Sequence, residues 1–220
     1  MKTHVYLMPG LGASSKIFDY IALPSDTYVL HYLEWVIPKS ENESIQEISE
    51  RLCGSITEKN CVLVGVSFGG IMVQEMSRIV NPQKTIIISS IKSSLELPKR
   101  LRIPKITKAY KLFPDKTISA IANFIENTFP TIAKKKVDHF NMYLSVRDPL
   151  YLRWAVYNVL HWKESEPVSN LYHIHGTKDE IFPSKHISNY IKIENGTHAM
   201  ILNKAKKINE ILLKILSESV

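Results

Sequence analysis

One short motif combines a hydroxyl nucleophile with the backbone that would expose it. Residues 65–69 have the spacing Gly-x-Ser-x-Gly, and they lie where an apolar run gives way to a helical pattern that begins at Phe68. A serine at such a strand-to-helix turn is held on a sharp, strained bend with its hydroxyl above the sheet. The flanking glycines let neighbouring backbone pass close to that bend. The motif alone also fits a tight turn around an inert Ser67, so its meaning depends on residues elsewhere.

A serine nucleophile needs a base that takes its proton and an acid that orients the base. His198 follows the last predicted strand and precedes the last predicted helix, and Asp179 follows the strand before it. In a parallel sheet, both would share with Ser67 the edge at the carboxyl ends of the strands, where open α/β sheets place their sites. Taken singly, His198 fits a packing residue and Asp179 fits a turn residue. Together the three predict a nucleophile, a base and an orienting acid.

Other titratable residues compete for the roles of base and acid. Glu180 is the main rival for the acid, and Asp148 is a weaker one. The chain has eight histidines. His173, His175 and His186 fall on predicted strands or helices, which makes them poorer bases than a loop histidine.

Alternating apolar runs and helical patterns predict the scaffold that would position these residues. Strands are predicted at residues 4–8, 28–33, 61–66, 85–89, 171–175 and 190–194. Helices are predicted near residues 15–21, 41–56, 68–80 and 199–216, the second of them starting from a capping box of Ser40 and Glu43. Because strands that are apolar on both faces alternate with helices, the pattern predicts an α/β fold with a doubly wound, mainly parallel six-stranded sheet.

The pattern changes between residues 93 and 165, where helical segments occur without a convincing strand. We therefore expect a single domain over residues 1–220 with a helical insertion at about 93–165. Trp35, at the end of the second strand, and Trp154 and Trp162, in the insertion, are candidates for an apolar substrate pocket. Most aromatic residues of the insertion are expected to form its own core instead. Besides Trp154 and Trp162, the aromatic residues of the insertion include Phe113, Phe124, Phe129, Phe140, Tyr143, Tyr151 and Tyr157.

Composition and charge set limits on the class of protein. Hydrophobic residues make up 45% and charged residues 22% of the 220, which is ordinary for a globular domain. No apolar run has the length of a membrane helix or a signal peptide, so a cytoplasmic protein is expected. The net charge is +7, and ten Lys and Arg residues lie between Lys99 and Lys136, where a solvated helical face or an anion-attracting surface is expected. Cys53 and Cys61 are expected to be buried thiols, and no cluster of Cys and His residues has the spacing of a zinc site.

Four stretches of the chain resemble the α/β-hydrolase superfamily: Pro9–Gly12, Gly65–Gly69, Gly176–Asp179 and Gly196–His198. The order of serine, aspartate and histidine along the chain is also that of the family, and the similarity spans almost the whole sequence. The resemblance implies a carboxylesterase-like serine hydrolase with Ser67, Asp179 and His198 as its catalytic triad and with the insertion as its cap. It further implies that the backbone N–H groups of Leu11 and Phe68 form the oxyanion hole.

The chain departs from the family pattern in two places. Pro9-Gly10 stands where the family often has His-Gly, and the chain starts at what would be the family's third strand, without the antiparallel edge strands. The implied substrate is an ester or thioester of a small or medium acyl group. No metal, cofactor, nucleic acid or stable membrane insertion is expected, and the oligomeric state is left open.

Three other functions fit parts of the sequence. Gly10-Leu11-Gly12 after a strand, with Glu34 closing the next one, partly matches a dinucleotide-binding oxidoreductase, but Ser15 replaces the last glycine of that fingerprint. A hydrolase fold also serves proteins that bind a ligand without catalysis. An acyltransferase would share the triad and differ only in the acceptor of the acyl group.

Overall fold

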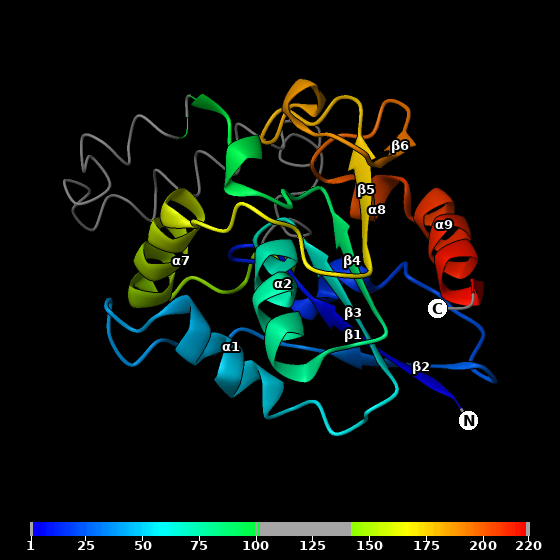
Figure 1. Cartoon of the computed structure of the whole chain (residues 1–220), viewed down its shortest axis with the longest axis horizontal. Coiled ribbons are helices and arrows are strands. Elements are labelled where there is room, and N and C mark those ends of the chain that lie inside the picture. The colour runs from blue at the N-terminus through cyan, green and yellow to red at the C-terminus, as the bar shows by residue number, and fades with distance from the viewer. Residues whose placement is uncertain (1, 100, 102–141, 219–220) are drawn as a thin grey trace.

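A single parallel sheet forms the centre of the molecule. The computed structural model describes residues 2–99, 101 and 142–218 (Figure 1). Within these residues, six strands pair in the order β2-β1-β3-β4-β5-β6, all parallel. The strands are β1 (Thr3–Met8), β2 (Tyr28–Tyr32), β3 (Cys61–Val66), β4 (Lys84–Ile88), β5 (Leu171–Gly176) and β6 (Ile191–Ile193). This confirms the predicted six-stranded sheet, with strand ends that shift by at most one residue.

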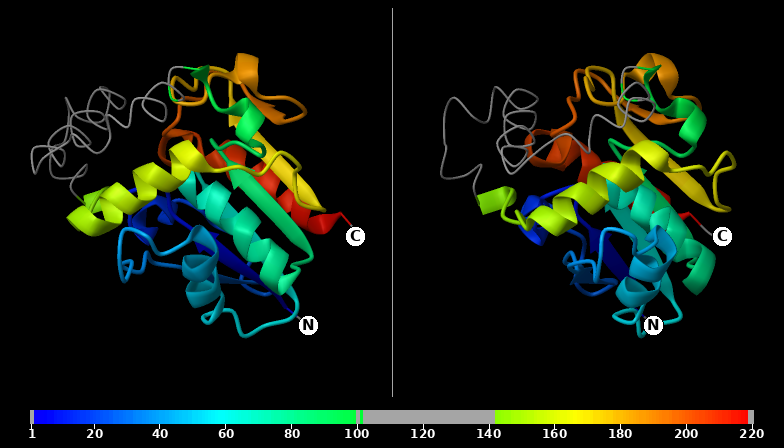
Figure 2. Two further views of the ribbon diagram at one scale, coloured as in Figure 1. Left: turned by 60° about the vertical axis from the view of Figure 1, so that its left-hand side comes forward. Right: turned by 90° about the vertical axis from the view of Figure 1, so that its left-hand side faces the viewer.

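Helices cover both faces of the sheet, as predicted. On one face lie α1 (Ile45–Cys53), α2 (Phe68–Val80) and α7 (Pro149–His161), and on the other lie α8 (Met200–Asn203) and α9 (Ala205–Ser217) (Figure 2). Short 3-10 turns occur at η1 (Ser15–Phe18), η2 (Ser94–Glu96) and η4 (Ser184–His186). None of the helices in the described ranges is long and apolar enough to cross a membrane.

Alternating residues of the central strands β1, β3 and β4 supply two separate cores. In β1, Tyr6 and Met8 pack on the side of α1 and α2, whereas Val5 and Leu7 pack on the side of α9. Successive side chains of a strand point to opposite faces, so a strand buried on both sides must be apolar throughout. The chain runs from β1 outward to β2 and then returns to β3 on the other side of β1. Sheets of this kind place their sites beside such a reversal, at the carboxyl ends of the strands.

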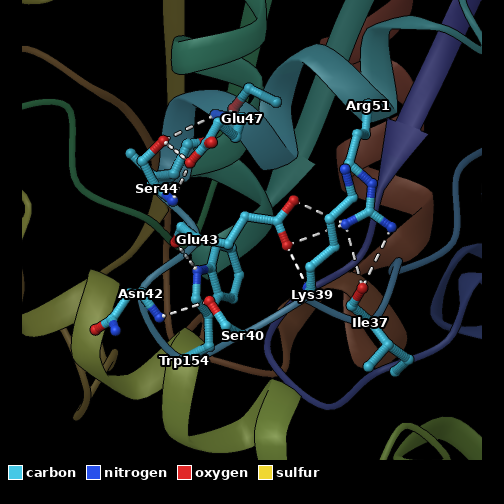
Figure 3. A network of polar contacts seen from close by, with 11 residues as sticks. Ile37, Lys39, Ser40, Asn42, Glu43, Ser44, Glu47, Arg51 and Trp154 are labelled. Atoms are coloured by element: carbon cyan, nitrogen blue, oxygen red, sulfur yellow. Dashed lines mark hydrogen bonds and ion pairs between the residues drawn. The ribbon is translucent and has the colours of Figure 1, made fainter.

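The capping box of α1 lies four residues later than predicted. Ser44, not Ser40, accepts a hydrogen bond from the amide of Glu47 at 3.1 Å, and the Glu47 carboxylate accepts one from the amide of Ser44 at 2.7 Å. The prediction was wrong because Glu43 has another role: its carboxylate pairs with Arg51 at 3.0 Å and accepts from the amide of Lys39 (Figure 3). The sequence Ser-x-x-Glu occurs twice in succession, and only the tertiary contact with Arg51 distinguishes the two.

Three predicted helices differ from the structure in type, length or continuity. The helix predicted at 15–21 is the 3-10 turn η1, and α1 ends at Cys53 rather than near residue 56 because the chain turns at Gly54. The helix predicted at 199–216 is broken at Lys204, whose φ of −125° is not helical. No glycine or proline marks this break, so the apolar spacing predicts a continuous helix.

Lys84, at the start of β4, anchors the C-terminal end of α9. Its side chain is buried, and its ammonium group donates hydrogen bonds to the backbone carbonyls of Ile215 and Glu218. The carbonyls at a helix C-terminus lack helical hydrogen-bond partners and carry partial negative charge. A cation there donates the missing hydrogen bonds and compensates the charge.

The described parts of the predicted insertion contain helical structure. Residues 93–99, 101 and 142–165 include η2 and α7 and no strand. Phe113, Phe124, Phe129 and Phe140 lie outside the described residues, as does the basic segment beyond Lys99 apart from residue 101. The boundaries of the insertion therefore stay a prediction.

Candidate active site

Ser67 lies on the bend between β3 and α2, and its backbone is strained. Its φ and ψ are 54° and −120°, a combination that costs a residue with a Cβ about 1–3 kcal/mol. Its amide donates to Ile88 O at 2.9 Å, while its carbonyl accepts from Gly70 N at 2.9 Å and from the Ser90 hydroxyl at 2.7 Å. Both backbone groups of Ser67 are therefore bound, and these contacts maintain the strained conformation.

The glycines around Ser67 are required by close backbone contacts. A Cβ at Gly65 would lie 2.2 Å from Gly69 O, and a Cβ at Gly69 would lie 2.4 Å from the carbonyl oxygens of Met8 and Pro9. The loop after β1 therefore lies directly against the bend. At Gly10 a Cβ would lie 3.3 Å from the Cβ of Ser67.

His198 links Ser67 to Asp179. Its Nε2 lies 2.8 Å from the Ser67 hydroxyl, and its Nδ1 lies 2.9 Å from Oδ2 and 3.1 Å from Oδ1 of Asp179. A carboxylate can only accept, so Nδ1 carries the proton of the neutral ring and Nε2 accepts from the hydroxyl. The structure brings the three predicted residues into one hydrogen-bonded series from loops that follow β3, β5 and β6.

Asp179 is buried and held as an anion. Burial by itself raises the pKa of its carboxyl, but the contacts with His198, the nearby His175 and the amide of Phe182 together hold that pKa below its ordinary value. The amides of Ile181 and Phe182 each donate to Oδ1 at 2.9 Å. The turn after β5 therefore fixes the direction of the carboxylate toward His198.

The rival acids occupy other places. Glu180 is exposed to solvent, although it is the next residue after Asp179. Asp148 caps α7, where its side chain accepts from the amide of Tyr151 at 2.9 Å. Neither carboxylate is hydrogen-bonded to His198 in the contacts of the described residues, so Asp179 is the acid of this series.

Two buried histidines of β5, His173 and His175, lie next to the turn that holds Asp179. Nε2 of His175 lies 2.8 Å from Phe182 O and therefore carries a proton, and Nδ1 accepts from His173 at 3.2 Å. Burial lowers the pKa of both rings, which favours their neutral forms. His186 is the last residue of η4. The sequence did not identify the contact of His175 with the turn that holds Asp179.

The two residues predicted to supply oxyanion amides are neighbours of Ser67 and of the Gly10 that lies against it. Phe68 is the first residue of α2, and Leu11 follows the Gly10 that lies against Ser67. Neither amide donates a hydrogen bond to another described residue. A pair of unengaged amides at this position can bind a developing negative charge.

The three tryptophans have different surroundings. The Trp35 ring stacks on Phe68 with a centroid separation of 5.0 Å, so it lies beside the site. Trp154 is fully buried and donates to Glu43 O at 2.7 Å, and Trp162 is buried and donates to the Glu75 carboxylate at 2.7 Å. The structure places these two indoles in the packed core, because both have almost no exposed surface that a substrate would touch.

The loop that resembles a dinucleotide fingerprint is engaged within the protein. The carboxylate of Glu34 accepts from the Ser15 amide at 3.2 and 3.3 Å and from the Ser15 hydroxyl. A ribose would have to displace these contacts. The described residues also include no group of three or more His, Cys, Asp or Glu side chains that would hold a metal ion, and both Cys53 and Cys61 are free thiols.

Comparison with known proteins identifies the fold through solved structures alone. No protein-family model and no curated protein sequence matches the chain. Among solved structures, a hydrolase from Pseudomonas aeruginosa PA01 has a TM-score of 0.74 at 15% identity, with 99% of this chain and 91% of that one covered. A thermophilic esterase from Thermogutta terrifontis has a TM-score of 0.72 at 17% identity, with 98% and 90% covered. A bromoperoxidase from Bacillus anthracis has a TM-score of 0.70 at 17% identity, with 99% and 93% covered. The sheet, the helices on its two faces and these similarities agree: the chain has the α/β-hydrolase fold.

Proposed function

We propose that the protein is a serine hydrolase that cleaves an ester or thioester of a small or medium acyl group. The observation that carries the proposal is the hydrogen-bonded series from the Ser67 hydroxyl through His198 to Asp179, with polar contacts of 2.8 and 2.9 Å. A nucleophile within hydrogen-bond reach of a base, and a base oriented by an acid, is the arrangement that covalent catalysis requires.

In the first half of the reaction, Ser67 forms a bond to the acyl carbon. As its oxygen attacks, the hydroxyl proton passes to Nε2 of His198, and Asp179 stabilises the resulting imidazolium. The amides of Leu11 and Phe68 donate to the negative oxygen of the tetrahedral intermediate. The intermediate then expels the alcohol or thiol, which takes the proton from His198, and an acyl-enzyme remains.

In the second half, water cleaves the acyl-enzyme. His198 takes a proton from the water as its oxygen attacks the acyl carbon, and the same two amides bind the second oxyanion. Collapse of this intermediate releases the carboxylic acid and returns the proton to Ser67. An acyl acceptor other than water would make the same residues an acyltransferase.

The names of the similar structures support hydrolysis over ligand binding. An esterase and a hydrolase are among the proteins that share this fold at nearly full length. A protein that only binds a ligand has no need for a strained serine whose hydroxyl is paired with a histidine and a buried carboxylate.

Labelling with a fluorophosphonate tests the proposal. We expect adduct formation at Ser67, its loss in Ser67→Ala, and strong slowing in His198→Ala because the base is absent. Ser25→Ala serves as the matched control, since Ser25 is an exposed serine far along the chain from the motif. An intact, folded protein that neither labels nor hydrolyses p-nitrophenyl or thioester substrates would refute the hydrolase and favour a ligand-binding protein. Labelling with acyl transfer to an added alcohol or amine, but without hydrolysis, would favour the acyltransferase.

A further inference from the structure

Trp35 contacts both segments that carry the proposed oxyanion amides. It follows β2, and its side chain is buried against the loop after β1. Its indole N–H donates to the carbonyl of Gly10 at 2.9 Å, and its ring lies almost parallel to that of Phe68, with an angle of 9° between the planes. One side chain therefore bridges the loop of Leu11 and the first residue of α2.

The contact with Gly10 controls the direction of the Leu11 amide. The Gly10 carbonyl and the Leu11 N–H belong to one planar trans peptide, in which the C=O and N–H bonds point in opposite directions. When the indole of Trp35 holds the oxygen on one side, the hydrogen must point to the other. The orientation of the donor is thus set by a residue that does not touch the oxyanion.

The Gly10 carbonyl accepts a second hydrogen bond, and this bond separates the role of Trp35 from that of the loop itself. The amide of Ala13 also donates to Gly10 O, at 3.1 Å, and closes the turn of the loop. That bond fixes the peptide within the turn but does not tie the turn to its neighbours. The Trp35 indole supplies the connection to the end of β2, and the hydroxyl of Tyr151 supplies another by accepting from the Gly12 amide at 3.2 Å.

The stacking contact restrains the second amide. The Phe68 ring contacts both Trp35 and Trp154, with centroid distances of 5.0 and 5.8 Å, and the two indoles also contact each other at 6.5 Å. Since Phe68 begins α2, its ring and its amide move with the start of that helix. A displacement of Trp35 would therefore change the spacing between the two amides.

We propose that Trp35 is a positioning residue that sets the direction of the Leu11 amide and its spacing from the Phe68 amide. This inference rests on the proposed function, because the two amides matter only where an oxyanion forms. It assigns Trp35 a role distinct from lining a substrate pocket. Pocket residues act on substrate binding, whereas oxyanion donors act mainly in the transition state.

The variant Trp35→Phe isolates the indole N–H because it keeps an aromatic ring against Phe68. We expect kcat for p-nitrophenyl acetate to fall by about 10-fold or more, less than the roughly 10²–10³-fold loss of a whole donor, since the Ala13 bond remains. We expect KM to change little, because the ground-state ester makes weaker contacts with the amides. The affinity for a trifluoromethyl ketone, which forms a tetrahedral adduct with the serine, should fall in parallel with kcat.

Ser49→Ala is the matched control for a lost buried hydrogen bond. The Ser49 hydroxyl donates to a backbone carbonyl, that of Ile45, at 2.8 Å within α1, and it is fully buried. We expect this variant to keep kcat and the ketone affinity even if its melting temperature falls. An equal kcat in Trp35→Phe and the wild type, or a rise in KM without a change in kcat, would overturn the positioning role and favour a pocket role.

A second measurement uses the wild-type protein, so it does not depend on the folding of a variant. The indole ¹⁵N–¹H resonance of Trp35, assigned through the proximity of that N–H to Gly10, should shift when the trifluoromethyl ketone binds, because the oxyanion polarises the shared peptide. An unchanged resonance would contradict the inference. Fluorophosphonate labelling of Ser67 separates the two proposals: labelling with an insensitive Trp35 refutes only the positioning role, whereas absence of labelling and turnover refutes the hydrolase.

Discussion

The substitution Asp179→Asn replaces one carboxylate oxygen of the hydrogen-bonded series with an NH₂ group and keeps the shape of the side chain. Oδ1 of the asparagine can still accept from the amides of Ile181 and Phe182, which lie 2.9 Å from Oδ1 of Asp179. These two bonds fix the side-chain orientation, so the NH₂ group must replace Oδ2 opposite Nδ1 of His198. The contact distance there is 2.9 Å. Two N–H groups cannot face each other at this distance, so Nδ1 of His198 must accept from the new NH₂ group, and the ring must carry its proton at Nε2.

A proton at Nε2 removes the base. The Ser67 hydroxyl then faces a donor at 2.8 Å rather than an acceptor, and its own proton has no group to take it. The loss in kcat for a wrong tautomer of this kind is about 10⁴-fold, equivalent to about 5 kcal/mol of transition-state stabilisation. The fold should be largely retained, because the turn that holds the side chain keeps its hydrogen bonds.

Steady-state hydrolysis of p-nitrophenyl acetate measures the effect, and circular dichroism verifies folding. Glu180→Gln is the matched control, since it also converts a carboxylate into an amide and lies one residue away on an exposed position. We expect wild-type kcat in that variant. A folded Asp179→Asn protein with kcat within tenfold of the wild type, or a larger loss in Glu180→Gln, would refute the assignment of the acid.

Four further substitutions test other parts of the structure. In Ser67→Gly, activity is lost but stability should exceed that of Ser67→Ala by about 1 kcal/mol in urea unfolding, because glycine tolerates the positive φ. Gly70→Ala should destabilise by about 1–3 kcal/mol, since its Cβ would lie 2.5 Å from the Ser90 side chain, and adding Ser90→Gly should recover part of the loss in the same assay. Lys84→Met should lower the free energy of unfolding by about 1–2 kcal/mol, as the carbonyls at the end of α9 lose a charged donor. Burial raises the pKa of Glu75, so the folded state binds the proton of this carboxyl more tightly than the unfolded state does and loses stability as pH rises toward neutrality. The melting temperature of Glu75→Gln should therefore rise relative to that of the wild type between pH 4 and 7. A difference in melting temperature that stays constant over this range would contradict the prediction.

The sequence predicts the site well where one residue type has one reason to be present. Glycine at positions 65 and 69 is required by backbone within 2.2–2.4 Å, so the motif reflects packing that few other sequences satisfy. In the parallel sheet the carboxyl ends of all six strands lie at one edge. This arrangement brings Ser67, Asp179 and His198 together even though they are far apart along the chain.

The sequence predicts poorly where one pattern has two uses. Ser40 and Ser44 both precede a glutamate by three residues, and the choice between them depends on Arg51, which pairs with Glu43 from the following helix. Tryptophan is similarly ambiguous. Their positions in the sequence make Trp35 and Trp154 pocket candidates, but the carbonyl partner of each indole N–H is determined only by the tertiary structure.

The strained backbone of Ser67 is itself an argument about function. A residue that only had to make this turn would be glycine, which adopts a φ of 54° without the penalty of a Cβ. The chain instead keeps a serine there and holds it with bonds from Ile88, Gly70 and Ser90, which maintain the conformation without removing its strain. What the strained serine offers, and glycine does not, is a hydroxyl directed at Nε2 of His198. Strain retained at a residue whose side chain meets a base is best explained by chemistry at that hydroxyl.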